Sequence, residues 1–402
     1  MQMQTLKGFR DFLPEEALKR NWLKSRIQKV FETWGYDPLE TPTLEPLELF
    51  SGQIGEEENL FFKFKDPGGR DVALRYDQTV PVCRVVGQYN QTIPFPFKRY
   101  QIQSAYRAEK PQKGRYREFL QCDADIFGVA SPYADAEVIA LSLDIYRQLG
   151  FNEAKVLIND RALLKEIPYN AIVAIDKLKK IGKEGVIAEM ISKGIEKKIA
   201  ESYLDTVLNL KPNETVNIIL AYLKNLDFPE NWYAFEPTIA RSFAYSTGPI
   251  WEVVIPGIES GSVLGGERYD KLVAKISGTD IPGTGFGIGF DRTLEAAEQF
   301  GLIPTLKTNS QVLVTVFKKE LLPLSLNLVD VLRKVGINTE LYPEPDVKLD
   351  KQLKYADRKG IPFVVIIGSD EKAKNLLKLK DMQKRTEELL SEKELINKLI
   401  KY

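Results

Sequence analysis

The spacing of hydrophobic residues predicts a helix near the start of the chain and a region of strands after it. Apolar residues recur every three or four positions after Pro14, and Gly35 ends this helical pattern. The residues at that spacing are Leu23, Ile27, Val30, Phe31 and Trp34. Residues 64–128 instead have mostly the alternation that strands show, except for a helix near residues 78–89.

The middle of the chain is mainly helical, with strands on either side. Residues 134–149 and residues 170–224 have helical patterns, and "AKVLIND" between them is typical of a strand. Strand character returns over residues 239–254. The stretch "GTGFGIGF" then predicts a glycine-rich strand that leads into another helix.

The last quarter of the chain alternates regularly between strands and helices. We expect residues 301–310 to form a linker. After it, "QVLVTVF" and "IPFVVIIG" predict buried strands, helical patterns separate the strands, and a terminal helix closes the chain. This order indicates a small α/β domain over residues 311–402 with a largely parallel sheet.

Composition excludes several classes of protein. The 402 residues include 56 basic and 56 acidic ones, so no overall basic field would draw the chain to nucleic acid. The absence of histidine excludes Ser-His-Asp triads and histidine metal ligands. Cys83 and Cys122 lack CxxC spacing, which argues against structural zinc and for a reducing cytosol. Without a signal-peptide pattern or a bilayer-length apolar run, we expect a cytoplasmic protein with no membrane contact.

The stretch "RYREFLQCDADIFG" has one apolar and one polar face when it is read as a strand. Gln121, Asp123 and Asp125 share the polar face with Phe119. The strand before it, within residues 98–109, also has a polar face, and a cationic loop connects the two. The polar face of that strand carries Arg99, Gln101, Gln103, Arg107 and Glu109, and the loop carries the basic residues Lys110, Lys113, Arg115 and Arg117. The sequence therefore predicts a hairpin that binds a polyphosphate and an ammonium group together, rather than a face that only meets water.

Several motifs resemble those of class II aminoacyl-tRNA synthetases, specifically the histidyl-tRNA synthetase family. "YRAEKPQKGRYREFLQCDADIFG" resembles motif 2, "GTGFGIGFDRT" resembles motif 3, and "GYDPLETPTLEP" resembles motif 1. "KGFRDFLPEE", "LRYDQTVPVCRVV", "IDKLKKIGKEGV" and "LKYADRKGIPFVVIIG" also match the family. The resemblance covers nearly the whole chain in the family's order, which makes it far more specific than any one glycine motif.

The resemblance implies an α+β fold: an antiparallel sheet flanked by helices, a helical insertion, and a C-terminal α/β anticodon-binding domain. The catalytic domain would comprise residues 1–162 and 226–300 and contain all three motifs. Residues 163–225 would form the insertion, residues 301–310 the linker, and residues 311–402 the anticodon-binding domain.

The family reaction uses ATP with Mg2+ and needs no covalent enzyme intermediate. By the resemblance, Arg107 binds the α-phosphate and the substrate carboxylate, and Glu109 reads the adenine amine. Arg115 and Arg292 hold the β- and γ-phosphates, and Arg241 supplies positive charge to the transition state. The implied catalytic residues are therefore Arg107, Arg241 and Arg292.

The amino acid would lie on the polar face of the hairpin. By the resemblance, Asp77, Thr79 and Gln121 hold its α-amino group, and Asp125 binds an imidazole nitrogen. The resemblance assigns no ligand to Asp123. Its carboxylate would instead hold nearby arginine side chains in place. The implied amino-acid pocket comprises Asp77, Thr79, Gln121, Asp125, Arg241, Tyr245 and Ser246.

The implied partners are histidine, tRNA(His) and a second copy of the chain. Gln112 and Arg117, in the motif 2 loop, are placed to meet the acceptor end of the tRNA. The motif 1 region around Pro42 would form a homodimer interface.

Structural readings of single residues compete with these roles. Asp77 is also suited to cap the helix that follows it. Arg292 is also suited to pair with Asp291 or Glu295 on a helix surface. The lysines of residues 177–183 are typical of a solvated helix face rather than of a tRNA contact.

The chain departs from the family where the imidazole would be read. The family loop R-G-L-D-Y-Y-T-G is replaced by "RSFAYSTG", so that Ala244 stands for the aspartate and Ser246 for the second tyrosine. In "SVLGGERYD", Leu264 and Glu267 replace smaller residues. The Ser246 hydroxyl would reach the ring through a water molecule, or Glu267 or Tyr245 would compensate.

Other functions remain open at this stage. One is a synthetase-like ligase for another amino acid, since only the amino-acid pocket is altered. Another is a non-catalytic regulatory paralogue, which would be expected to lose its phosphate-binding arginines and its anticodon domain. A tRNA-binding module would bind RNA without exchanging pyrophosphate with ATP.

Overall fold

The structure, a computed structural model, divides into two compact units and describes residues 3–51, 61–111, 115–240, 245–258, 261–305 and 307–401. The first unit comprises Met1–Asp11 and Leu23–Ile303, and the second comprises Phe12–Trp22 and Pro304–Tyr402. Among the helices of the described ranges, none combines the length and the apolar character that crossing a bilayer requires.

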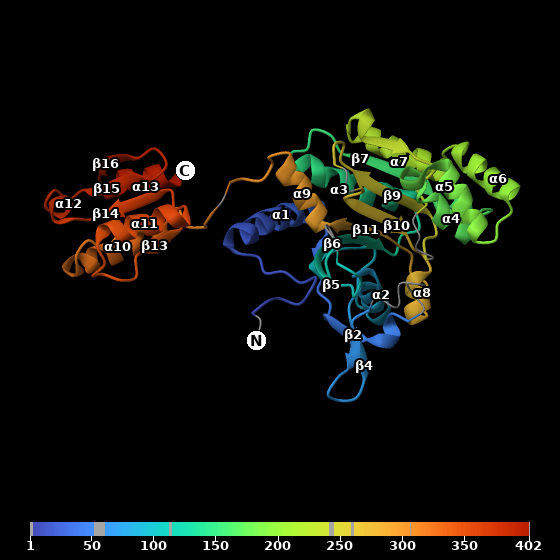
Figure 1. Cartoon of the computed structure of the whole chain (residues 1–402), viewed down its shortest axis with the longest axis horizontal. Helices are drawn as coiled ribbons and strands as arrows, with labels where there is room; N and C mark the ends of the chain where they lie inside the picture. Colours follow the sequence, from blue (N-terminus) through green and yellow to red (C-terminus); the bar gives the residue numbers. More distant parts are fainter. Residues whose placement is uncertain are drawn as a thin grey trace. The chain divides into compact units, whose positions relative to one another are not determined.

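The first unit is built on a mostly antiparallel sheet. Within the described residues this sheet has eight strands in the order β1-β5-β6-β11-β10-β9-β7-β8 (Figure 1). The end pairs β1–β5 and β7–β8 are parallel, and the pairs between them are antiparallel. The strand bounds are β1 Asp37–Pro38, β5 Phe97–Tyr106, β6 Glu118–Phe127, β11 Gly283–Gly289, β10 Leu264–Arg268, β9 Pro249–Val254, β7 Lys155–Asp160 and β8 Tyr233–Phe235. The predicted α+β class is confirmed.

Helices cover the apolar face of the sheet, where Cys122, Ala124 and Ile126 of β6 lie buried. The bounds of these helices are α1 Pro14–Thr33, of which the residues from Leu23 onward belong to this unit, α3 Pro132–Leu149 and α9 Phe290–Gln299. Phe31 of α1 stacks on Tyr100 of β5 with ring centroids 5.2 Å apart. The predicted helix after Pro14 is confirmed: α1 buries Leu23, Ile27, Val30 and Phe31, whereas Trp34 lies just beyond its end.

The opposite face of the sheet carries two further helices at one end. They are α2 Thr79–Gln88 and α8 Leu272–Ser277. They pack together with Phe127 of β6 in one apolar cluster. Cys83 of α2 and Cys122 of β6 are both buried and neither forms a disulfide, and burial raises the pKa of the Cys83 thiol well above its usual value. Beyond this cluster the same face becomes polar.

A buried ion pair joins α3 to β10. The Nε atom of Arg268 donates to both carboxylate oxygens of Asp135 at 3.0 Å. Its Nη1 atom donates to Asp270 at 2.8 Å. The side chains of Arg268 and Asp135 are 6% and 1% exposed, so the pair is almost fully removed from water. This pair fixes the helix against the strand that carries Glu267 on its other face.

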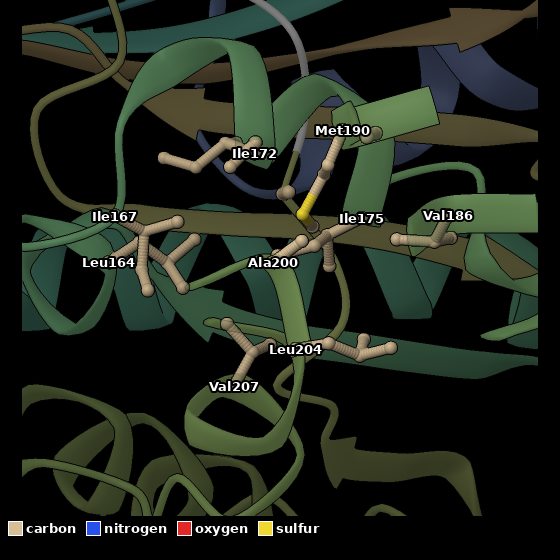
Figure 2. Packing of buried hydrophobic residues seen from close by; sticks show 12 residues of the cluster. Leu164, Ile167, Ile172, Ile175, Val186, Met190, Ala200, Leu204 and Val207 are labelled. Atoms are coloured by element: carbon tan, nitrogen blue, oxygen red, sulfur yellow. The ribbon is translucent and has the colours of Figure 1, made fainter. Parts of the chain in front are cut away.

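A small antiparallel sheet and a helical segment extend the unit. The small sheet has the order β2-β4-β3, with β2 Leu44–Pro46, β4 Asp71–Leu74 and β3 Lys63–Lys65. The helical segment contains α4 Tyr169–Ile175, α5 Leu178–Ser192, α6 Lys197–Leu208 and α7 Glu214–Asn225. Helices α4 to α6 share an apolar cluster of their own, in which Met190 of α5 lies with Ile172 and Ile175 of α4 (Figure 2). Helix α7 instead packs against α3. The boundaries expected for the insertion, residues 163–225, stay a prediction.

The strand predicted over residues 239–254 is shorter than expected. In the structure β9 begins only at Pro249, and residues 241–244 lie outside the described residues. The Nδ2 atom of Asn159 donates to the carbonyl oxygens of Pro237 and Ile239, at 2.9 and 2.8 Å. A side chain therefore satisfies backbone groups that a strand would have paired in a ladder.

The second unit contains a sheet in the order β13-β12-β14-β15-β16 (Figure 1). The bounds are β12 Val312–Val314, β13 Thr339–Leu341, β14 Phe363–Ile366, β15 Leu377–Asp381, β16 Thr386–Leu390, α10 Leu322–Lys334, α11 Leu349–Lys359, α12 Ser369–Ala373 and α13 Glu392–Ile400. The first three strands are parallel, as predicted, but β15 and β16 form an antiparallel hairpin that the sequence analysis missed. Four of the five residues of β16 are exposed. This edge strand therefore lacks the alternation of buried apolar and exposed polar residues that predicts a strand.

We expect Asp135→Ala to lower the free energy of unfolding by about 3 kcal/mol, because it removes the buried partner of Arg268. Denaturation by urea, followed by intrinsic fluorescence, measures this loss. The control is Asp280→Ala, which removes an ion pair to Lys271 whose side chains are 72% and 68% exposed. The control should change stability by less than about 0.5 kcal/mol. Equal losses in the two variants would contradict the assigned role of the buried pair.

Candidate active site

The polar face predicted for the hairpin extends over three neighbouring strands. Strands β5 and β6 pair from Phe97↔Phe127 to Tyr106↔Glu118, which confirms the hairpin. Directly paired residues of neighbouring antiparallel strands project from the same face of a sheet. The residues aligned across β5, β6 and β11 are Arg99, Asp125 and Gly285; Gln101, Asp123 and Gly287; and Gln103, Gln121 and Gly289. Gln121, Asp123 and Asp125 of β6 therefore each lie beside a glycine.

The glycines of β11 leave room for the side chains of β6. A methyl group on Gly285 would overlap the carboxylate of Asp125. A methyl group on Gly287 would lie 2.9 Å from Oδ1 of Asp123 and 3.2 Å from Nε2 of Gln121. This strand needs glycine to admit neighbouring side chains and to leave space above the sheet.

A cavity of about 370 Å³ lies on this face. Most residues predicted for the site line it: Asp77, Thr79, Arg107, Glu109, Arg115, Gln121, Asp125, Tyr245 and Arg292. Ser246 and Arg117 are absent from the lining. Arg241 and Gln112 lie outside the described residues.

One end of the cavity gathers arginines. The guanidinium carbon of Arg107 lies 4.3 Å from the ring centroid of Tyr76 and 4.9 Å from that of Phe119. Burial lowers the pKa of Arg292, and the nearby charges of Arg115 and Arg107 lower it further. Positive charge is thus concentrated at this end, as a site for phosphate groups requires.

The contacts of Arg292 bear on its alternative reading as a surface ion-pair partner. Nη1 of Arg292 donates to the carbonyl oxygen of Ser262 at 2.9 Å, and the nearby Asp291 pairs with Arg10 at 3.0 Å. Arg292 is therefore held at the cavity by a backbone oxygen. Arg115 and Glu109 lie 3.6 Å apart, so they form a loose pair at the same end.

The opposite end of the cavity gathers buried carboxylates. Oδ2 of Asp125 pairs with Arg99, and Oδ1 accepts a hydrogen bond from the hydroxyl of Tyr269. Burial raises the pKa of Asp125, and Arg99 opposes this effect. Burial also raises the pKa of Asp123 well above its usual value. The charges of Arg99 and Arg107 oppose this rise, whereas those of Asp125 and Asp77 add to it. A bound cation would relieve this concentration of negative charge.

Asp77 and Gln121 complete this acidic end. Oδ1 of Asp77 accepts a hydrogen bond from the backbone N–H of Val80 at 3.2 Å, so Asp77 does bind the first turn of α2 as the structural reading expected. It also lines the cavity, and the two roles are compatible because a carboxylate accepts several hydrogen bonds. Nε2 of Gln121 donates to Asp123 at 3.2 Å.

The two altered segments meet beside the cavity. The hydroxyl of Ser246 donates a hydrogen bond to Oε2 of Glu267, and both residues are buried. Glu267 lines the cavity. Tyr245, which also lines it, packs edge-on against Tyr269 with ring centroids 6.3 Å apart.

Arg117 serves a backbone contact rather than the cavity. Its Nε atom donates to the carbonyl oxygen of Glu109 at 3.1 Å, and Nη1 donates to that of Lys7 at 3.3 Å. Its backbone N–H donates to the carbonyl oxygen of Gly8 at 2.9 Å. Arg117 therefore ties the first residues of the chain to the segment between β5 and β6.

Sequence reasoning missed the contributions of Tyr269 and Tyr76, and it named Arg99 without its partner. Arg99 and Tyr269 hold Asp125, and Tyr76 stacks on Arg107. Alternation along β5 does place Arg99 on the polar face, but its partner depends on the register between strands.

Sequence comparisons identify relatives along the whole chain. The family model described as Histidyl-tRNA synthetase matches residues 8–184 and 192–293, and the one described as Anticodon binding domain matches residues 311–402. The histidine–tRNA ligase of Cytophaga hutchinsonii is 37% identical, with 98% of each chain covered. That of Aeropyrum pernix is 39% identical and covers 91% of this chain and 90% of its own.

A solved structure agrees with the sequence relatives. The crystal structure of histidyl-tRNA synthetase from Nostoc sp. PCC 7120 has a TM-score of 0.86 and 28% identity, and the match covers 100% of this chain and 99% of that one. The family match extends over more than half of the chain, and the relatives exceed 30% identity over nearly their full lengths. The chain belongs to the histidyl-tRNA synthetase family.

Proposed function

We propose that this chain attaches histidine to tRNA(His) with ATP in two steps. The carboxylate of histidine attacks the α-phosphorus of ATP, which forms a histidyl-adenylate and releases diphosphate. A hydroxyl of the terminal ribose of tRNA then takes the histidyl group and releases AMP. The observation that supports this proposal is the cavity itself, because arginines gather at one end and buried carboxylates at the other.

The arginine end would bind ATP. Arg107 would contact the α-phosphate and the histidine carboxylate, and Glu109 would accept a hydrogen bond from the adenine amine. Arg115 and Arg292 would hold the β- and γ-phosphates. The aromatic rings on either side of Arg107 restrict its guanidinium, so less entropy would be lost when it binds phosphate.

The carboxylate end would bind the amino acid. Asp77, Thr79 and Gln121 would hold the α-ammonium group, and Asp125 would meet an imidazole nitrogen. Asp123 lines the same end of the cavity, where its negative charge would favour the ammonium group. Catalysis would then consist of positioning the carboxylate near phosphorus and of neutralising the charge that develops there.

Two further parts of the reaction rest on the family resemblance. Arg241, outside the described residues, would add positive charge near the α-phosphate. Mg2+ would bind the phosphates of ATP and neutralise part of their charge. In the described ranges no group of three or more acidic or thiol side chains is arranged to hold a metal ion alone. Glu109 lines the cavity with the arginines and would be a nearby oxygen donor to an ion carried by the triphosphate.

The remaining partners belong to the same proposal. Residues 311–402 would bind the anticodon, and Gln112 and Arg117 would lie near the acceptor end of tRNA(His). We also propose a homodimer through the motif 1 region, where Pro42 is exposed in the single chain, and a cytoplasmic location.

Pyrophosphate exchange into ATP, measured with each of the twenty amino acids in turn, tests the proposed substrate. We expect histidine alone to support exchange. Exchange with a different amino acid would overturn the assignment of histidine. No exchange with any amino acid, in a protein that binds tRNA, would overturn the assignment of a catalytic function.

We expect Arg107→Ala to lower the rate of histidine-dependent exchange by about a hundredfold, since it removes a charge that contacts the developing phosphoryl group. Initial rates at saturating ATP and histidine measure this effect. Arg70→Ala is the control, because its side chain is 81% exposed and pairs with Asp66 outside the cavity. The control should keep the rate of the unmodified protein. A rate for Arg107→Ala within a few-fold of the control would argue against its role.

We expect Gly285→Ala to lower kcat/KM for histidine by about a hundredfold, because the added methyl group displaces the carboxylate of Asp125. The KM for ATP should change little, since the arginines lie at the other end. In the control, Gly68→Ala, the nearest atom would be Oδ1 of Asp66 at 3.3 Å, outside the cavity. Equal effects of Gly285→Ala on histidine and ATP would indicate a general distortion instead.

A further inference from the structure

We propose that Glu267 is a specificity-determining residue that accepts a hydrogen bond from one imidazole N–H, and that Ser246 positions it. This inference rests on the proposed function, because it takes histidine as the amino acid that occupies the cavity. It assigns the reading of the imidazole to two carboxylates, Asp125 and Glu267, on opposite sides of one glycine.

The strand register places the two carboxylates on either side of Gly285. Glu267 of β10 pairs with Gly285 of β11, and Gly285 pairs with Asp125 of β6. Neighbouring strands are about 4.8 Å apart, so the Cα atoms of Asp125 and Glu267 are separated by roughly 10 Å. Because Gly285 has no side chain, the carboxylate of Asp125 extends over it toward the strand of Glu267, so a planar ring bound on this face of the sheet can meet both carboxylates.

The charge of Asp125 is already compensated within the protein. Its two oxygens bind the guanidinium of Arg99 and the hydroxyl of Tyr269. Each oxygen can still accept another hydrogen bond, so Asp125 can orient a ring nitrogen. A ring that carries N–H groups on both nitrogens needs a second acceptor on its other side, and among the residues of the cavity lining Glu267 supplies it across Gly285.

Glu267 is held in a defined position. It is 5% exposed, and its Oε2 atom accepts the hydroxyl hydrogen of Ser246. Burial lowers the pKa of Arg161, and the charges of Tyr169 and Glu267 oppose this effect, so Arg161 lies within electrostatic range of Glu267. A hydroxyl partner and a cation within range are the kinds of partner that the carboxylate of a buried glutamate requires.

The smaller Ser246 and the larger Glu267 form one arrangement. A serine at position 246 brings a short hydroxyl that ends at Glu267 instead of reaching toward the ring. The two departures from the family pattern therefore meet in a single hydrogen bond, with Glu267 on the cavity side. Tyr245 and Tyr269, in edge-on contact, form the adjoining aromatic wall.

Histidine and its two ring-methylated derivatives, each of which lacks one N–H donor, test this assignment in the pyrophosphate exchange reaction. We expect the unmodified protein to reject both derivatives, because each leaves one carboxylate without its donor. Glu267→Gln should raise the KM for histidine about tenfold or more while the KM for ATP stays within about twofold. It should also lose discrimination against only one of the two derivatives. Ser246→Ala should give a smaller effect in the same direction.

The matched control is Glu340→Gln, since Glu340 also accepts a hydrogen bond from a serine, Ser310, but lies in the second unit. Exchange does not involve tRNA, so this control should keep both KM values. Unchanged discrimination in Glu267→Gln and Ser246→Ala, or equal losses for ATP and histidine, would overturn the assignment of Glu267. An unmodified protein that fails to use histidine at all would instead overturn the proposed function. Thermal-shift measurements with histidinol test separately whether each variant still binds the amino-acid analogue. If Glu267→Gln does not fold, Ser246→Ala still tests the assignment.

Discussion

The alignment of three neighbouring strands is the constraint on which the cavity depends. The ladder between β5 and β6 fixes which residue of one strand faces which residue of the other, and β11 continues this alignment with glycines. A shift of one residue would turn Gln121, Asp123 and Asp125 toward the helices and bring Cys122 and Ala124 to the cavity. The apolar face of β6 prevents this shift, because its burial under the helices stabilises one register only.

The same alignment concentrates charges that folding alone would not favour. Burial raises the pKa values of Asp123 and Asp125, which means that their charged forms are destabilised in the free protein. At the other end, burial and the positive charges of Arg115 and Arg107 lower the pKa of Arg292, so its charged form is destabilised as well. Such conflicts between stability and charge placement are typical of functional sites, where the ligands bring the missing opposite charges.

The sequence predicted those parts of the fold that follow from local patterns. Alternation along residues 119–126 identified both faces of β6, and helical spacing identified α1. The hairpin of β15 and β16 was missed because β16 is an exposed edge strand with little apolar alternation. The irregular segment before β9 was missed because its backbone bonds to the side chain of the distant Asn159.

Site prediction had a similar limit. Motif residues such as Arg107, Gln121 and Arg292 could be named from the sequence, and they line one cavity. The partners of these residues depend on contacts between distant segments. The pair of Asp125 with Arg99 requires the register, and the bond of Arg117 to Lys7 joins residues 110 positions apart. Neither contact leaves a pattern within one segment of the chain.

The positions of the two cysteines make the first unit separately observable. Both thiols are buried, one on α2 beneath the acidic end of the cavity and one on the covered side of β6, and the sequence contains no others. A reagent that modifies free sulfhydryl groups can therefore react only when this unit opens, while the second unit contributes no signal. The rate of that modification reports local opening of the catalytic sheet in the intact chain, without an engineered probe.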